Sequence, residues 1–548
     1  MPERAKEKKS ISPLVSSWVM GGVLAAVIFS LSTKGMLSEG SISMNGDMSR
    51  HLMNGALILD FFRELPLADP LRFLYRYYAA YPALSLGFHP PLLPMVEAPF
   101  FALLGVSVFS GRVVILAFLL AGIRGWFALI RLVFDRKVAF LSSLLLVTNP
   151  FIVRHSRTVM TDIPALSMVM ITVYLFERYS RGRERTLSLF LTSLLLSALA
   201  RPQTLFMIAV YLLHGVTSGG VRRFRSSLTA PRFLLSTFCL SGLIVLTLRF
   251  GSHNLSWLTH GSLLHGFRRE SILYPLECLG MYHFAPFTLT AAVISLFIAL
   301  WRKEGRVALF LLWIGCCYLQ AVCIGPSEPR YSLYWIPPFC LLMALLPSLP
   351  GRRWSVVATI CILAMVASQF VTAFAMESEP MEGYRDTARY LAEEGKGKIV
   401  LYSSDLDTGY FCFFTRSLDP WRKSLVLRAD KILATSNYNK IVENRITRRG
   451  DLYKVMTDLG IDHVVLQGGE FHSSSLNLLR DEVKTDRFRL LKAIPVSTRG
   501  GRFGASVISI YEFRGHTPPK PGAELRMNLP LVNGRISVRM DELTSGWP

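Results

Sequence analysis

Two aspartates stand in polar segments that border long apolar runs. Asp47 lies in SMNGDMSRH, and Asp162 lies in RHSRTVMTDIPALSM. A carboxylate in such a place can remove a proton from an acceptor hydroxyl or amine. Each aspartate can also act only as a helix N-terminal residue, because a negative charge there interacts favourably with the helix dipole. The spacing of each residue alone favours this second role.

Basic residues in similar segments suit a phosphate group. Arg201 lies in LSALARPQTL and Arg330 lies in GPSEPRYSLYW, both at the predicted outer ends of apolar runs. Positive charge is not expected on the outer side of a membrane, so these arginines are candidates for a binding role. A side chain that reaches toward lipid headgroups is the alternative. Further candidates in outer segments are His51, His89, Arg157 and Arg268.

Two carboxylates and several arginines on one face of a helical bundle suit one kind of reaction. Arginines match the phosphate of a lipid carrier, and fixed cations stabilise a leaving phosphate. We therefore predict transfer of a sugar from a polyprenyl-phosphate-linked donor to an extracytoplasmic glycolipid, cell-envelope glycan or protein. The alternatives are a transporter or flippase of a lipid-linked glycan, a glycan polymerase or ligase of another fold, and an inactive scaffold. A transporter would place its charges in mid-membrane or show an inverted repeat, and neither pattern is present.

The elements that must position these residues are membrane-spanning helices. The chain has 548 residues, of which 51% are hydrophobic, and the hydrophobic residues occur in long runs with few charges. Runs of this length are typical of spans rather than of soluble cores. Eleven spans are predicted, at 13–32, 111–131, 138–153, 163–177, 187–200, 203–216, 233–250, 284–301, 307–324, 331–348 and 354–374.

The chain has a net charge of +22, and the positions of its basic residues determine the predicted topology. Basic residues form six separate clusters between apolar runs, which is the pattern of cytoplasmic loops and not of a nucleic-acid-binding patch. The cytoplasmic N-terminus places 33–110 outside as a long loop with interfacial helices. The segment 89–104 contains four prolines and Glu97 and is short for a span, so we expect it to lie at the membrane surface. The six clusters begin at Arg4, Arg131, Arg178, Arg222, Arg302 and Arg352.

After residue 376 the chain has the pattern of a soluble domain. Short apolar runs alternate with helical stretches, which predicts an extracytoplasmic α/β domain at 377–515. Residues 516–548 begin with a segment rich in proline and glycine, and we expect a loosely ordered tail. A disulfide between Cys278 and Cys412 is possible, since both are predicted to lie outside. The predicted fold is an α-helical polytopic membrane protein, 1–376, followed by this domain.

The order of the polar segments resembles the GT-C superfamily of integral membrane glycosyltransferases. The similarity is greatest to the bacterial branch with protein O-mannosyltransferases, the lipid A aminoarabinose transferase and RgtA/B/C/D-like enzymes. It covers roughly residues 40–345. The matching pieces are Asp47 in the first outer loop, FHPPLLPMVEAPFFALLG, TNPFIVRHSRTVMTDIPAL, ALARPQ and EPRYSLYWIPP.

The resemblance implies a role for each of these positions. Asp47 would be the catalytic base or orient the acceptor, and Asp162 would be the second carboxylate of the active site. Arg201, Arg330 and Tyr331 would bind the donor phosphate, and His89 occupies the family's x-Pro-Pro turn. Some relatives have an adjacent Asp-Glu pair in the first loop, whereas Met48 follows Asp47 here.

The resemblance also implies a cellular setting and a view of cofactors. It points to the bacterial cytoplasmic (inner) membrane, with an inverting reaction at its outer face. Asp47 and His51 are four residues apart and could share a helix face, with Asp162 as a third ligand of a divalent metal. Oligosaccharyltransferases of the wider superfamily use such a metal, whereas the nearest branch does not. We expect no metal and no other cofactor.

Overall fold

A computed structural model describes most of the chain. The described residues are 13–38, 47–85, 89–217, 268–302, 305–326, 328–348, 351–377, 381–393, 398–404, 409–436, 442–468, 471, 473–498, 506–529 and 534–545. The predicted span at 233–250 and the basic cluster that begins at Arg222 lie outside these residues.

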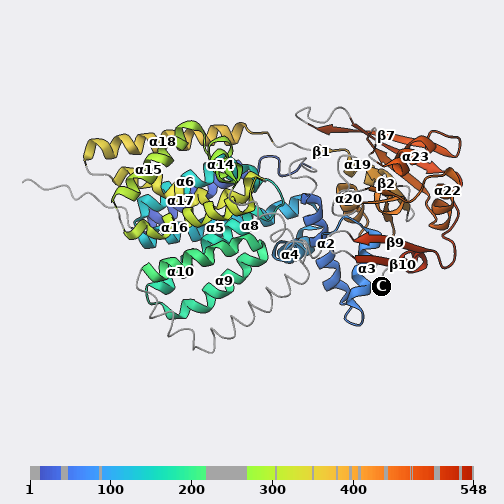
Figure 1. Cartoon of the computed structure of the whole chain (residues 1–548), viewed down its shortest axis with the longest axis horizontal. Helices are drawn as coiled ribbons and strands as arrows, with labels where there is room; N and C mark the ends of the chain where they lie inside the picture. Colours follow the sequence, from blue (N-terminus) through green and yellow to red (C-terminus); the bar gives the residue numbers. More distant parts are fainter. Residues whose placement is uncertain are drawn as a thin grey trace, which may run out of the picture.

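The first part of the chain is helical, and Figure 1 shows its helices packed side by side at one end of the molecule. The sheet region occupies the other end. The α-helices of this part are α1 (Pro13–Ser32), α5 (Val108–Val133), α6 (Arg136–Thr148), α7 (Pro150–Ser156), α8 (Asp162–Ser180), α9 (Leu187–Ala200), α10 (Met207–Thr217), α14 (Arg269–Cys278), α15 (Pro286–Arg302), α16 (Ala308–Ile324), α17 (Ile336–Ala344) and α18 (Arg352–Ala375). Short 3₁₀ or π turns join several of them, among them η2 (Pro202–Phe206), η4 (Leu279–His283) and η6 (Pro329–Trp335).

Several of these helices have the length and composition of membrane spans. Among the described residues, four qualify, at Val108–Val133, Gly305–Ile324, Pro329–Ser348 and Arg352–Ala375. Helices α6 and α7 make a fifth if they are counted together, although they meet at an angle of 64°. The chain is therefore a multi-pass membrane protein, whereas the count of eleven spans and the side on which each end lies stay predictions.

The bend between α6 and α7 has a local cause. Pro150 has no amide hydrogen and fits the first turn of a new helix. The side-chain oxygen of Asn149 accepts from the amides of Phe151 and Ile152 at 3.0 and 3.2 Å. Its amide nitrogen donates to the carbonyl of His283 at 2.8 Å. The bend is thus held by hydrogen bonds at its corner.

Helices α5 and α8 approach closely because glycines face α8. A Cβ atom on Gly122 would lie 2.7 Å from the Cα of Ser167. One on Gly125 would lie 2.9 Å from the side chain of Ile171. Any larger residue would push the helices apart. This contact fixes the position of α8, which begins at Asp162.

Three helices lie between the helical part and the sheet region. They are α2 (Asp47–Glu64), α3 (Pro70–Ala80) and α4 (Leu92–Leu104). Gly55 of α2 leaves room for Glu97 of α4, since a Cβ at Gly55 would lie 2.8 Å from the Cβ of Glu97. Glu97 is fully buried, and neither carboxyl oxygen has a hydrogen-bond partner in the described part of the chain. Burial raises the pKa of Glu97 well above its ordinary value.

The C-terminal part is built on a six-stranded mixed sheet in the order β1-β7-β8-β6-β2-β3. Strand β2 pairs in parallel with β3 and β6, and the other pairs are antiparallel. Every residue of β6 is buried, as expected for a central strand covered on both faces. The strands are β1 (Met381–Glu382), β2 (Ile399–Ser404), β3 (Leu425–Arg428), β6 (His463–Gln467), β7 (Phe488–Thr498) and β8 (Ser506–Phe513).

The remaining elements of this part connect or flank the sheet. A small antiparallel pair is formed by β4 (Ala434–Ser436) and β5 (Val442–Asn444). The helices are α19 (Tyr384–Glu393), α20 (Tyr410–Leu418), α21 (Ala429–Ile432), α22 (Arg449–Asp458) and α23 (Ser474–Glu482).

The prediction of a loosely ordered tail was wrong. The described part of 516–548 contains an antiparallel hairpin of β9 (Glu524–Leu529) and β10 (Gly534–Arg539), which is followed by α24 (Met540–Thr544). The hairpin buries alternate residues, which are Leu525, Met527, Ile536 and Val538. This period-two pattern outweighs the proline and glycine content of the segment that precedes it.

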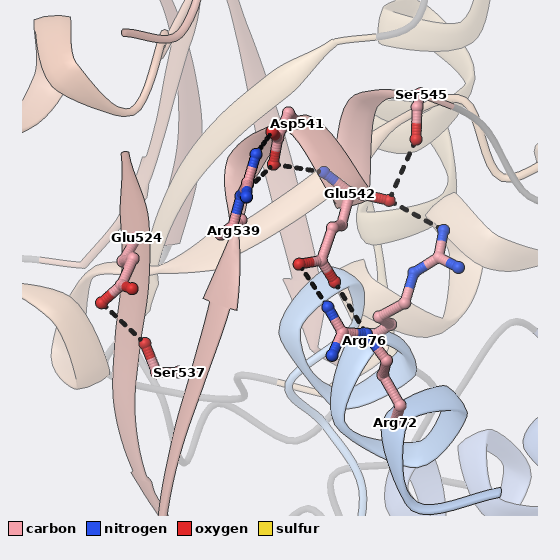
Figure 2. Close-up of polar contacts among 8 residues, drawn as sticks. All are labelled: Arg72, Arg76, Glu524, Ser537, Arg539, Asp541, Glu542 and Ser545. Atoms are coloured by element: carbon pink, nitrogen blue, oxygen red, sulfur yellow. Dashed lines mark hydrogen bonds and ion pairs between the residues drawn. The ribbon is translucent and has the colours of Figure 1, made fainter. Parts of the chain in front are cut away.

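Helix α24, which follows the hairpin, contacts α3. Figure 2 shows Glu542 between Arg72 and Arg76. Its carboxylate accepts from Arg72 at 2.6 and 3.1 Å, and its carbonyl accepts from Arg76 at 2.7 Å. The C-terminal region therefore contacts α3 of the first part of the chain.

Candidate functional site

Four of the residues singled out in the sequence come together from four separate elements. Asp47 and Asp162 are the first residues of α2 and α8. Arg201 follows α9 directly, and Arg330 lies in η6. Nη2 of Arg330 lies 3.5 Å from Asp47, and its Nη1 lies 3.9 Å from Asp162. Arg330 thus stands between the two carboxylates.

Asp162 is the more enclosed of the two aspartates. Its side chain is fully buried, and one oxygen accepts a hydrogen bond from Arg201. The other oxygen, Oδ2, has no hydrogen-bond partner among the described residues, although Nδ1 of His155 lies 3.9 Å away. A buried carboxylate with a close arginine is suited to holding that arginine in place.

Asp47 is more accessible, with 18% of its side chain exposed. Arg50 lies 3.3 Å away on the next helical turn, and Nε2 of His89 lies 3.8 Å away. Burial would raise the pKa of Asp47, but the nearby ring of His89 and the charge of Arg50 outweigh it and lower the pKa well below its ordinary value. Asp47 is therefore ionised and can accept a proton from a group that reaches it.

The ring of Tyr331 lies beside both arginines. The guanidinium of Arg201 is 4.9 Å from its centroid, and that of Arg330 is 5.7 Å away. A cation over an aromatic face is held without neutralising its charge. The Nε of Arg330 also contacts Glu328 at 2.7 Å. These contacts orient the two guanidinium groups within the site.

Two histidine rings contact each other near Asp47. The ring centroids of His51 and His89 are 4.3 Å apart, and His51 is fully buried. Burial lowers the pKa of both rings below the ordinary value of 6.5. Both are therefore neutral at pH 7.

The structure adds residues that the sequence analysis did not single out as candidates. His155 lies near Asp162, Glu328 pairs with Arg330, and Arg50 pairs with Asp47. Each stands within seven residues of a predicted site residue. Proximity in the sequence was the available signal, but helix geometry decides which neighbours face the site.

Two predicted supporting residues do not join the cluster. Arg157 was expected near the site, but its guanidinium donates to three backbone carbonyls instead, those of Leu31, Ala373 and Met376 at 2.8–2.9 Å. It therefore joins the end of α7 to the ends of α1 and α18. Arg268 is exposed directly before α14, and the described contacts do not connect it with the cluster.

The contacts of Arg157 indicate that it contributes to folding stability. Arg157→Met should lower the free energy of unfolding by about 2 kcal/mol or more, because three carbonyls lose a charged donor. The specific activity of the folded fraction should change little. Thermal unfolding in detergent, with the exposed Arg185→Met as control, measures the effect. A large loss of activity at unchanged stability would contradict a structural role.

The metal site considered from the sequence would need Asp47, His51 and Asp162 to gather around one ion. Among the described residues, no three His, Cys, Asp or Glu side chains are arranged to hold one ion. Asp47 and Asp162 instead meet arginines, which compete with a cation. The possible disulfide is also absent, since Cys278 and Cys412 are both buried and are not disulfide-bonded.

Comparison with known proteins gives matches of fold and of family. Residues 88–246 match the family model described as dolichyl-phosphate-mannose-protein mannosyltransferase. ArnT from Cupriavidus metallidurans bound to undecaprenyl phosphate has a similar structure, with a TM-score of 0.58 at 12% identity over 91% of this chain and 98% of that chain. Its apo form gives 0.59 with the same identity and coverage.

A third structure is similar over less of its own length. The apo oligosaccharyltransferase of Archaeoglobus fulgidus has a TM-score of 0.50 at 12% identity, covering 83% of this chain and 70% of that chain. No curated protein sequence matches the chain.

The chain therefore shares the fold of ArnT, with a helical part followed by a smaller C-terminal region with a sheet. The family-model match and this fold together confirm the resemblance to the GT-C superfamily that the five sequence motifs indicate.

Proposed function

We propose that the chain transfers a sugar from a polyprenyl-phosphate-linked donor to a hydroxyl or amine of an extracytoplasmic acceptor. The observation that carries this proposal is the position of Arg330 between Asp47 and Asp162, with Arg201 beside it. A carboxylate that can take a proton and cations that can bind a phosphate thus lie in one place. Undecaprenyl phosphate bound to ArnT of the same fold supports this kind of donor.

The geometry favours particular roles for the two arginines. Arg330 is 3.5 and 3.9 Å from the two carboxylates, which is longer than a good hydrogen bond. Its Nε contacts Glu328 at 2.7 Å, so Nη1 and Nη2 are the atoms that would meet a donor phosphate. Arg201 is held closely by Asp162 and supplies a fixed positive charge. The two cations would stabilise the polyprenyl phosphate as it leaves.

Asp47 would then act as the base. Its ionised carboxylate takes the proton of the acceptor as the acceptor oxygen or nitrogen bonds to the anomeric carbon. The bond from that carbon to the phosphate oxygen breaks, and the electron pair stays on the phosphate. Attack opposite the leaving phosphate inverts the anomeric centre. This scheme needs no metal or other cofactor.

A direct assay tests the proposal. The purified protein, in vesicles, is given polyprenyl-phosphate sugars and a mixture of envelope glycolipids and glycans as acceptors. Release of polyprenyl phosphate together with a glycosylated product is the expected result. Movement of the intact donor across the bilayer without release of polyprenyl phosphate would favour a flippase and contradict the proposal.

The low pKa of Asp47 sets the expected pH dependence. A carboxylate with a depressed pKa stays ionised until the pH falls below its ordinary value of 3.8. We therefore expect kcat/KM to show no acid limb from Asp47 between pH 7 and about 5. Any stability that Asp47 contributes is present above the unfolded pKa and lost as pH falls through the folded one.

The variant Arg50→Gln provides a second test of Asp47 as the base. It removes a cation that lowers the pKa of Asp47, so the pH at which Asp47 takes up a proton should rise. The fall of kcat/KM at acid pH should then begin at a higher pH than in wild type. A wild-type limb near pH 6 that Arg50→Gln leaves unchanged would mean that another group is the base.

A further inference from the structure

Helix α2 connects the candidate site with the C-terminal domain. Asp47 is its first residue, and Asp60 and Glu64 lie near its other end. These two acids are four residues apart and so share one face of the helix. Asp60 pairs with Arg416 and Glu64 pairs with Arg422, both in the C-terminal domain. One face of α2 is thus held by two arginines that are distant in sequence.

The pair between Asp60 and Arg416 is a buried fork. Nε and Nη2 of Arg416 donate to the two carboxyl oxygens at 2.8 and 2.6 Å. The hydroxyl of Tyr77 donates to Asp60 at 2.8 Å. Both charged side chains are 3% exposed or less. A buried two-point pair of this kind fixes distance and angle more strictly than an apolar contact does.

The second pair includes a backbone conformation that is rare for its residue type. Arg422 has a φ of +52°, in the left-handed region that favours glycine. Both Arg422 and Glu64 are nearly buried. Such a conformation persists only where the surroundings require it, and here it accompanies the contact with α2.

We propose that the C-terminal domain positions the catalytic helix, with Asp60 and Arg416 as positioning residues that keep Asp47 next to Arg330. This inference rests on the proposed function. Asp47 and Asp60 are thirteen residues apart, about 20 Å along the helix. A tilt of about 5° at Asp60 would move Asp47 by nearly 2 Å, and a misplacement of about 1 Å can cost 10²-fold in rate.

The test removes the fork without leaving a buried charge unpaired. In the triple variant Asp60→Leu, Tyr77→Phe, Arg416→Met, apolar side chains of similar size replace the pair, an exchange that often leaves folding stability unchanged. We expect kcat to fall by about 10²-fold with little change in the KM of the donor. Arg416→Lys keeps the charge but not the fork, and should give a smaller loss.

A matched control cuts another contact between the same two parts of the chain. Arg72→Gln with Glu542→Gln removes the ion pair between α24 and α3 (Figure 2), which does not involve α2. Its kcat should stay within about twofold of wild type. Equal melting temperatures of all variants would show that the fold is kept, and wild-type kcat in a folded triple variant would overturn the proposal.

Hydrogen exchange separates this inference from the proposed function. In the triple variant, the amides of 48–56 should exchange faster than in wild type, and in the control they should not. If the wild-type protein transfers no sugar from any donor, the proposed function fails while this result still decides whether the domain holds α2. Unchanged exchange across 48–56 would reject the positioning role.

Discussion

Asp47→Asn is expected to lower kcat by about 10²–10⁴-fold, the contribution typical of a general base. The amide has nearly the same shape but cannot take the proton of the acceptor. The KM of the donor should change less, because Arg201 and Arg330 remain. Initial rates with a polyprenyl-phosphate sugar, at saturating acceptor, measure the effect.

The chain offers a control for this experiment in the next outer helix. Asp69 also stands directly before a helix, where its side chain accepts from the amide of Arg72 at 2.9 Å. Asparagine caps helices as well as aspartate does, so Asp69→Asn should leave both stability and rate unchanged. If Asp47→Asn behaved like Asp69→Asn, Asp47 would be a capping residue, the role that its spacing alone favours.

Arg330→Met should have the second large effect, a fall in kcat/KM of about 10²–10³-fold. The variant removes the cation between Asp47 and Asp162, so a donor phosphate would meet two carboxylates with one arginine fewer. Arg330→Lys keeps the charge without the two-point geometry and should recover only part of the loss. Steady-state kinetics and the binding of undecaprenyl phosphate measure the two effects together.

Arg306→Met is the matched control. Arg306 lies in the turn before α16, 5.2 Å over the ring of Phe134, and belongs to a loop predicted to be cytoplasmic. Its loss should leave kcat/KM within about twofold. Equal effects of the two substitutions would point to a general need for surface charge and would count against a donor site at Arg330.

Helices of the membrane part were predictable because apolar runs and flanking charges report directly on burial and on loops. The predicted span 111–131 corresponds to Val108–Val133, and 354–374 corresponds to Arg352–Ala375. The division of 138–153 into two helices was not predicted, although Pro150 marks the break. Hydropathy measures whether a segment is apolar and not whether it is straight.

Most residues of the site could be predicted from the sequence, whereas their contacts could not. The positive-inside rule predicts that Asp47, Asp162, Arg201 and Arg330 share one side of the membrane. It does not say which carboxylate is enclosed, and the sequence gives no sign that Arg416 would reach α2 from far along the chain. Arg157 was assigned to the site because it stands close to Asp162, whereas three carbonyls at the ends of α1 and α18 decide where it binds.

The carboxyl group of Glu97 bears on the prediction that α4 lies at the membrane surface. A raised pKa keeps this group protonated, so α4 carries no charge at neutral pH. Met95, Leu103 and Leu104 are at least half exposed on the same helix. Contact between α4 and hydrocarbon would therefore require no desolvation of an anion. We expect no crossing by this helix because of its length, since thirteen residues extend only about 20 Å against a hydrocarbon layer of about 30 Å.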